Sequence, residues 1–328
     1  MINEDYRNLG YPSFNMVSLE IFTYSFVIPH HNTPHLLRRL VDSIPIRRDI
    51  EIIVVDDGSD IDKRADVRRN DVRIIYIDKE SSKGAGRARN VGMDAAKGKW
   101  LLFADADDFY KPGFIDVLDE YKDDDIEMLF YNIDSVDSDT LLSSTQNRAD
   151  LHQRLISSYN GTKETIDNLL FMGFGPWRRM FRSDYIKEYG FRFEETPKGN
   201  DQFFSLATSY FAKKWKVETR TVYILTYAKE SLTYSKLTKP KILADLNILR
   251  RRAKLYRFMG HPEWNFRCYR GRYFQSCIAY CYRLFKKNPT EGMKAFVYYL
   301  TNLFSIEKKS NSYIKEIKRI ESFREINR

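Results

Sequence analysis

Residues 99–108, Lys99-Trp100-Leu101-Leu102-Phe103-Ala104-Asp105-Ala106-Asp107-Asp108, decide the fold of this chain. The apolar run at 100–104 predicts a fully buried strand, and three carboxylates follow it directly. Residues i and i+2 of an extended chain point to the same face, so Asp105 and Asp107 can converge at the carboxyl end of the strand. Because neighbouring carboxylates repel one another, the stretch indicates either a divalent-metal site for a phosphate-bearing ligand or a solvated acidic turn.

Strands and helices alternate in the first third of the chain. Short apolar runs predict four strands, at residues 24–28, 51–55, 73–77 and 100–104. A helix opened by Gly84-Ala85-Gly86 precedes the last of them, and this alternation predicts an α/β fold with a mostly parallel sheet and flanking helices. The second strand also ends in acids, Asp56 and Asp57. Parallel strands end at the same edge, so we expect both acid clusters to face one crevice.

The middle of the chain is less regular. Residues 128–133 predict another strand, and 134–144 form a polar loop. The acids of that loop lack the central glycine and final glutamate of an EF-hand, which favours a solvated loop over a calcium site. Residues 162–190 are predicted to be helical with one interruption at 173–179, and a short strand is predicted at 191–195.

A further acid stands at the start of a predicted helix. Phe203, Phe204 and later apolar residues recur at helical spacing, with Asn200 as the expected N-cap and Asp201 in the first turn. Local sequence allows two interpretations of Asp201. It either stabilises the helix dipole by about 0.3–1 kcal/mol or acts as a general base at the mouth of the crevice.

The overall composition is that of an ordinary globular protein, with 328 residues, 43% of them hydrophobic, and a net charge of +9. The cysteines, Cys268, Cys277 and Cys281, are odd in number and form no Cys-x-x-Cys pair, which argues against a disulfide framework or a zinc site. No apolar run approaches the ~18 residues of a spanning helix, and the polar N-terminus does not resemble a secretory signal. We therefore expect a cytoplasmic protein, soluble or peripheral on the inner face of the cell membrane.

Charge divides the chain into two parts. Residues 231–328 hold 22 Lys and Arg against 7 Asp and Glu, whereas residues 1–230 hold 32 against 38. We predict an α/β domain at 1–230 and a basic, aromatic-rich helical appendage at 231–328. The appendage has several open roles: a helical core with a solvated basic face, contacts with the acceptor or an anionic membrane surface, oligomer contacts, or nucleic-acid binding.

Five segments in order resemble the inverting nucleotide-sugar transferases of glycosyltransferase family 2, which have the GT-A fold. The resemblance covers about residues 24–235. Its motifs are Ile28-Pro29-His30-His31-Asn32, the acid-ended strand 54–60, the glycine-opened helix 84–92, Phe103-Ala104-Asp105-Ala106-Asp107-Asp108, and Asn200-Asp201-Gln202-Phe203-Phe204.

The resemblance implies a donor site for a nucleotide sugar, most simply a UDP-sugar. Asp57 would accept a hydrogen bond from the uracil N3–H, and Pro29 and His31 would line the base, with Asn32 in the same motif. Arg89 would approach the ribose or diphosphate, helped by the N-terminus of its helix. The family usually has Tyr where His31 stands.

The resemblance also implies a metal and a base. Asp105 would contact the ribose side, and Asp107, with Asp105 nearby, would hold Mn²⁺ or Mg²⁺ against the diphosphate. Asp201 would deprotonate the acceptor hydroxyl, which attacks the anomeric carbon from the opposite face and inverts it. Trp177 and Asn200 would lie on the acceptor side, although the family usually has Glu where Asn200 stands.

These features predict a metal-dependent glycosyltransferase of bacterial surface polysaccharide synthesis (capsule, O-antigen or lipopolysaccharide), acting on a saccharide acceptor carried by a lipid. A phosphatase-type Asp-x-Asp nucleophile is disfavoured because Phe109 stands where Thr or Val is normal. A sugar nucleotidyltransferase is disfavoured because the first loop is not glycine-rich. The alternative from a different class is a non-catalytic protein that binds nucleic acid or membranes through the basic C-terminal region, and we expect no nucleic-acid partner.

Overall fold

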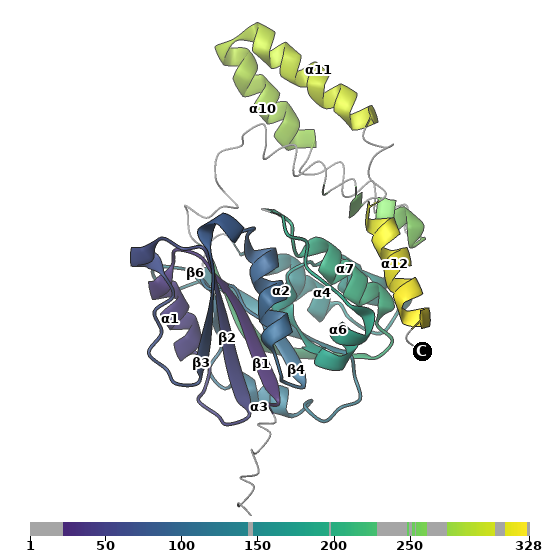
Figure 1. Cartoon of the computed structure of the whole chain (residues 1–328). Helices are drawn as coiled ribbons and strands as arrows, with labels where there is room; N and C mark the ends of the chain where they lie inside the picture. The colour runs from purple at the N-terminus through teal and green to yellow at the C-terminus, as the bar shows by residue number, and fades with distance from the viewer. Residues whose placement is uncertain are drawn as a thin grey trace, which may run out of the picture.

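The computed structural model describes residues 22–143, 147–196, 198–227, 248, 251–252, 254–260, 274–305 and 312–326. Over these residues the chain forms one eight-stranded sheet in the order β3-β2-β1-β4-β7-β6-β8-β5, covered by helices on both faces (Figure 1). Further helices follow toward the C-terminus. The predicted α/β class, with a mostly parallel sheet, flanking helices and a C-terminal helical part, is confirmed.

The first half of the sheet is parallel. Its strands are β3 (Val72–Ile77), β2 (Ile50–Asp57), β1 (Tyr24–His30) and β4 (Trp100–Phe103). Alternate residues face opposite sides, so Phe26 lies in one hydrophobic core and Val27 in the other. All seven residues of β1 are buried, as expected for a central strand covered on both faces.

The second half of the sheet has mixed directions. Strand β7 (Arg179–Arg182) pairs antiparallel with both β4 and β6 (Met128–Asp137). Strand β8 (Trp215–Tyr227) then pairs parallel with β6 and antiparallel with β5 (Phe109–Tyr110). The carboxyl ends of β1, β2 and β4 therefore lie at the same edge of the sheet as the later part of β8, and the turn after β4 contacts Tyr223 and Thr226 of β8.

Helices complete a three-layer structure. One core, against α1 (Pro34–Asp42) and α3 (Phe114–Asp119), lies on one face of the sheet. The other core contains Leu255, Tyr256 and side chains of six further helices. These are α2 (Ala85–Ala95), α4 (Asp150–Ser157), α5 (Lys163–Phe171), α6 (Ser183–Tyr189), α7 (Gln202–Phe211) and α12 (Ser312–Ile326).

Three local predictions were wrong. The strand predicted at 191–195 is irregular, because the Asn90 side chain bonds both the N–H and the C=O of Phe193 and replaces a strand partner. Part of the predicted helical stretch forms β7 instead, because its alternating side chains fill the gap between β4 and β6. The polar loop predicted from Asp134 begins later, since β6 continues to Asp137 alongside β8.

The described C-terminal residues are mostly helical. Helices α10 (Phe274–Lys287) and α11 (Pro289–Ser305) pack against each other as a hairpin (Figure 1). Helix α12 instead joins the α/β core, where Tyr313, Ile317 and Ile320 are buried. Among the described helices, none combines the length and the apolar character needed to cross a bilayer. Cys268 lies outside the described residues.

Candidate active site

Two adjacent aspartates at the end of β2 have different environments. The Asp56 carboxylate accepts hydrogen bonds from the N–H groups of Ser59 and Ala65, both at distances below 3 Å, and is bonded to His30. Burial opposes ionisation of Asp56, but these bonds outweigh it and lower the pKa. Asp56 therefore shapes the loop after β2.

Asp57 differs because half of its carboxylate is unpaired. Its Oδ2 accepts hydrogen bonds from the Gly84 N–H at 2.7 Å and the Ser82 hydroxyl at 2.8 Å. Its Oδ1 is buried and accepts no hydrogen bond from the described part of the chain. A buried acceptor without a partner costs about 1–3 kcal/mol, so this oxygen suits a donor group on a ligand.

The loop after β1 lies beside Asp57. The His31 Nδ1 is 2.9 Å from the Asp57 main-chain carbonyl, and the ring is exposed. Asn32 adopts φ of 58° and is fixed by hydrogen bonds from its N–H to Ser59 and from the Asp60 N–H to its side chain. Pro29 is buried within β1 opposite Val55, so the structure places it beneath the loop and not at its surface.

Arg89 connects the two sides of the site. It lies on α2, whose N-terminal glycine, Gly84, has φ of 85°. The guanidinium donates to Asp105 Oδ1 at 2.5 Å and to Asn200 Oδ1 at 2.8 Å, and only 6% of its side-chain surface is exposed. One cation thus joins the end of β4 to the residue before Asp201.

The acidic turn after β4 contains three carboxylates in different surroundings. Asp108 is buried and accepts hydrogen bonds from the Thr226 N–H and the Tyr223 hydroxyl. Burial, reinforced by the charges of Asp107 and Asp105, raises the pKa of Asp108 well above its usual range. Burial and the Asp105 charge also raise the pKa of Asp107.

Residues from other elements hold this turn in place. The Asp107 main-chain carbonyl accepts hydrogen bonds from Arg39 on α1 and Thr226 on β8, at 2.5 and 2.6 Å. The Tyr223 hydroxyl accepts the Asp105 N–H at 2.9 Å. Arg148 and Arg39 partly offset this rise in the pKa of Asp107, but their shown hydrogen bonds go to the main-chain carbonyls of Thr226 and Asp107, and among the described residues neither forms an ion pair with the Asp107 carboxylate. That carboxylate is therefore available to a ligand.

Asp201 occupies the N-cap position of α7, one residue earlier in the helix than the sequence predicted. Its carboxylate makes no capping hydrogen bond, and its main-chain carbonyl starts the helix by accepting the Ser205 N–H. Burial raises the pKa of Asp201 to about 6, an effect that Arg89 opposes and that Asp105 and Glu194 reinforce. A carboxylate with this pKa is a competent general base near neutral pH.

Trp177 belongs to a short 3₁₀ turn (Pro176–Arg178) beside the turn after β4. Its ring stacks on Tyr223, with centroids 5.9 Å apart and planes inclined by 7°. The next two residues, Arg178 and Arg179, are fully buried, and both donate to the Gly173 carbonyl. Arg179 also donates to the Ser205 carbonyl on α7, so these arginines fix Trp177 and α7 relative to each other.

The structure thus brings Arg89, Asp105, Asn200 and Asp201 together, and Asp57 bonds Gly84 at the start of the helix that carries Arg89. Residues that sequence reasoning missed support this site, namely Arg39, Arg148, Tyr223 and Thr226, together with Glu194, Arg251 and Tyr313, which are described below. Two of them lie on β8, whose run of Val, Thr, Tyr and Ile is a recognisable strand signal. The others depend on contacts between residues distant in sequence.

The acidic turn fits a divalent cation. Asp107 offers a desolvated carboxylate with a raised pKa, the condition that a cation relieves, and Asp105 lies two residues away. No group of three or more His, Cys, Asp or Glu suited to a metal occurs within the described residues. Mg²⁺ is commonly held by one or two carboxylates, substrate phosphates and water, so these two acids are a sufficient protein contribution.

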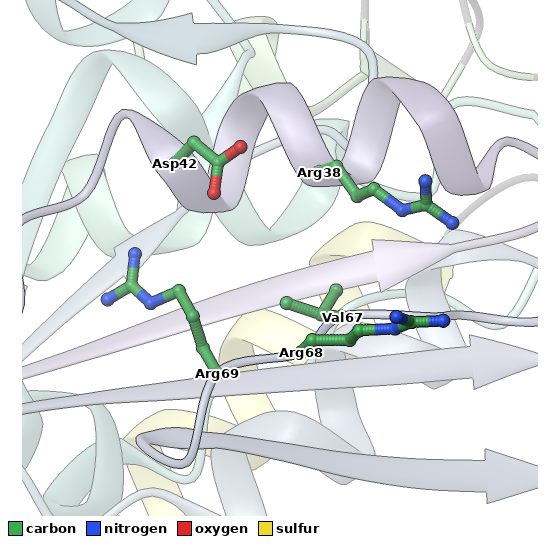
Figure 2. A pocket seen from close by; sticks show the side chains of 5 residues that line it. All are labelled: Arg38, Asp42, Val67, Arg68 and Arg69. Carbon is green, nitrogen blue, oxygen red and sulfur yellow. The ribbon is translucent and has the colours of Figure 1, made fainter.

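A separate pocket of about 360 Å³ lies between α1 and residues 67–69 (Figure 2). Arg38, Asp42, Val67, Arg68 and Arg69 line it. Arg38 pairs with Asp66 there, and Arg69 pairs with Asp71 while bonding the carbonyls of Val41 and Ile44. These arginines join the end of α1 to the segment before β3, and the pocket shares no residue with the site above.

Comparison with known sequences identifies a family model. Residues 25–190 match the family described as Glycosyl transferase family 2. EpsH of Bacillus subtilis is 26% identical over 209 residues, which are 60% of this chain and 58% of EpsH. The succinoglycan biosynthesis protein ExoO of Rhizobium meliloti is 26% identical over 195 residues, 56% of this chain and 55% of ExoO. The matches thus span less than two thirds of either relative.

Comparison with solved structures identifies the same architecture. The crystal structure of S. aureus TarS 1–349 in complex with UDP-GlcNAc aligns with a TM-score of 0.55 and 16% identity. The alignment covers 93% of this chain and 91% of that one. At this identity the likeness establishes a shared GT-A fold, and it extends over the C-terminal part that the family model leaves unmatched.

Proposed function

The chain belongs to glycosyl transferase family 2, and from that premise we propose that it moves a sugar, with inversion, from a UDP-sugar to a hydroxyl of a saccharide acceptor. The observation that carries the proposal is the Arg89 bridge, which joins Asp105 after β4 to Asn200 beside Asp201. The pathway we propose is bacterial surface polysaccharide synthesis with a lipid-linked acceptor, supported by the relative named for succinoglycan biosynthesis.

The donor half of the site recognises the nucleotide. The unpaired Asp57 Oδ1 accepts the N3–H of uracil, and the exposed His31 ring covers the base. Arg89 neutralises part of the diphosphate charge near the start of α2. The TarS structure of the same fold was determined with UDP-GlcNAc, which supports a UDP-sugar donor.

Asp107, with Asp105, would hold Mn²⁺ or Mg²⁺. When bound, such an ion neutralises negative charge on the diphosphate leaving group. The residues of the chain perform the remaining steps. Asp201 accepts the proton of the acceptor hydroxyl. At the same time, the hydroxyl oxygen of the acceptor forms a bond to the anomeric carbon, and the bond from that carbon to the diphosphate breaks. UDP leaves on the opposite face, so the configuration at the anomeric carbon inverts.

A screen of nucleotide sugars tests this function. We expect turnover of one UDP-sugar with Mn²⁺ or Mg²⁺, loss of turnover with EDTA and recovery on adding the metal. Asp107→Ala should lose metal-dependent turnover, while Asp62→Ala, an exposed acid in the turn after β2, should not. Full activity in EDTA would refute the requirement for a metal ion, and retention of anomeric configuration in the product would refute the single-step mechanism.

The α10–α11 hairpin is our candidate for a membrane-facing surface. Ile278, Tyr282 and Phe285 form an exposed apolar stripe on α10, and Met293 and Phe296 are exposed on α11. Arg283 and Lys286 lie beside the α10 stripe, within a region of +15 net charge. Aromatic residues flanked by cations match the interface of an anionic bilayer, where a lipid-linked acceptor resides.

Co-sedimentation tests this assignment. The chain should bind vesicles containing phosphatidylglycerol and not vesicles of phosphatidylcholine alone, and the triple variant Tyr282→Ser, Phe285→Ser, Phe296→Ser should lose most binding. Binding of duplex DNA with equal affinity would instead favour nucleic-acid binding, and absence of vesicle binding would refute the membrane assignment.

A further inference from the structure

Phe193–Asn200, the segment leading to Asp201, is held on one side by α2. Asn90 forms hydrogen bonds with both main-chain groups of Phe193, at 2.9 and 3.0 Å. Gly86 allows the closest approach, because a Cβ atom there would lie 2.0 Å from the Glu194 carbonyl oxygen. The Glu194 N–H in turn donates to the Asn200 carbonyl at 3.1 Å, which closes the segment into a loop.

The other side of the loop is held by residues from the C-terminal third of the chain. Arg251 forms an ion pair with one oxygen of Glu194, and the Tyr313 hydroxyl donates to the other oxygen at 2.7 Å. The Arg251 guanidinium also lies over the Tyr313 ring, 4.6 Å from its centroid. Arg251 and Tyr313 are separated by 61 intervening residues, yet they converge on a single carboxylate.

The same C-terminal elements reach the first turn of α7. The Tyr313 ring lies 4.7 Å from the ring of Phe203, two residues after Asp201. Ile248 contacts the turn at Gly199, where φ is 65° and an added Cβ atom would lie 2.6 Å from the Ile248 Cδ1. Contacts on both flanks of Asp201 thus come from Ile248 and Tyr313, in the C-terminal part of the chain.

We propose that Arg251 and Tyr313 are positioning residues that act through Glu194 to fix the Asp201 carboxylate toward the acceptor. The C-terminal third is on this account a working part of the active site and not an appendage to it. The inference rests on the proposed function only in taking Asp201 as the general base. Neither Arg251 nor Tyr313 needs to touch the substrate.

The electrostatic environment of Asp201 offers a readout specific to positioning. The charge of Glu194 raises the pKa of Asp201, and Arg251 balances that charge. Removing Arg251 should raise the pKa of Asp201 further, whereas Glu194→Gln should lower it. If the two residues acted through packing alone, the two variants would not shift this pKa in opposite directions. The charged and titratable groups that face Asp201 are Arg89, Asp105, Arg179, Glu194 and Tyr313.

The test uses the full chain and two measurements. The first is a ¹³C NMR titration of the aspartate carboxyls, with Asp201→Asn for assignment. Arg251→Gln should raise the Asp201 pKa by about 0.5 unit and Glu194→Gln should lower it by a similar amount. The second is turnover of UDP-GlcNAc with Mn²⁺, for which we expect kcat to fall about 10-fold in Arg251→Gln and about 3-fold in Tyr313→Phe at nearly unchanged KM.

Controls separate positioning from folding. Arg251→Lys keeps the charge and should recover part of kcat, and Arg319→Gln breaks an exposed ion pair with Glu316 on α12 and should change nothing. An unshifted Asp201 pKa in Arg251→Gln and Glu194→Gln would overturn the inference, as would wild-type kcat in Arg251→Gln and Tyr313→Phe. Failure of the proposed function looks different: the wild-type chain would turn over no nucleotide sugar, while the NMR titration would still report on positioning.

Discussion

The proposed donor and acceptor halves of this site are built in different ways. The donor half takes Asp57, Arg89 and Asp105 from strand–helix units that follow one another within fifty residues, and parallel pairing of β1, β2 and β4 brings them together. The acceptor half assembles Trp177, Asp201 and their supports from segments distant in sequence. Local pattern therefore suffices to predict the first half, whereas the second depends on tertiary contacts.

The halves also differ in how charge is compensated. Arg89 in the donor half is paired with the Asp105 carboxylate. In the acceptor half, the buried Arg178 and Arg179 donate hydrogen bonds to main-chain carbonyls and a serine hydroxyl, and Arg178 also contacts the ring of His152. Burial accordingly lowers the pKa of Arg179 to about 9. The acceptor half thus contains costly buried charge, which serves to fix α7 and the Trp177 turn.

Asp201→Asn should separate the two halves most strongly. Transfer should fall about 10³-fold, because a positioned general base contributes 10²–10⁴-fold, while the Kd for UDP should stay within about twofold of wild type. Steady-state kinetics and calorimetry measure these quantities. If more than a tenth of the activity survives, Asp201 is not the base.

Asp57→Asn should affect the opposite half. The amide still fills the site, but its single NH₂ group must oppose either the uracil N3–H or the Gly84 N–H, so affinity for UDP should fall about 10–100-fold. At saturating donor, kcat should change less than about threefold. The matched control is Asp62→Asn, on an exposed position of the following turn. Equal UDP affinity in both variants would contradict the assignment of Asp57.

Arg179→Met should show that the acceptor half relies on buried hydrogen bonds. The change leaves the carbonyls of Gly173 and Ser205 with fewer donors, so the free energy of unfolding should fall by about 2 kcal/mol. Arg154→Met, which breaks an exposed pair with Asp150, should cost less than about 1 kcal/mol. Urea denaturation measures the free energy of unfolding of both variants. Similar losses in the two would contradict the claim that the acceptor half relies on buried hydrogen bonds.

The raised pKa of Asp201 predicts two pH effects of smaller size. Since the base must be ionised, kcat/KM should fall below a midpoint near the pKa of about 6. The folded state also binds the proton more tightly than the unfolded state, so ionising Asp201 destabilises the fold as pH rises from about 4 to 6. Asp201→Asn should therefore gain stability relative to wild type as pH rises from about 4 to 6, and should be no more stable than wild type below pH 4.

The sequence analysis predicted the α/β class, the strands of the parallel half and the meeting of both acid clusters at one sheet edge. These features depend on buried apolar runs and on the shared direction of parallel strands, which are local properties. It missed β7, whose four residues form a strand only because β4 and β6 lie on either side of it. It also missed β8, although its alternating residues gave a usable signal.

Site residues follow the same division. Asp57, Arg89, Asp105 and Asp107 stand at strand ends or at the start of a helix, where sequence position indicates their location. Glu194, Arg251 and Tyr313 carry no motif, and their relation appears only when α12 packs beside α7. The proposed acceptor side, which is built from such contacts, is accordingly the part of the site that the sequence predicts least.

The central claim is that donor and acceptor halves surround one nucleotide sugar. A crystal structure of the Asp201→Asn protein with its UDP-sugar and Mn²⁺ tests it most directly. The account predicts uracil N3 within hydrogen-bonding distance of Asp57 Oδ1, the diphosphate beside Arg89 and Asp107, and the anomeric carbon facing residue 201. A nucleotide bound elsewhere, or an anomeric carbon directed away from α7, would contradict it.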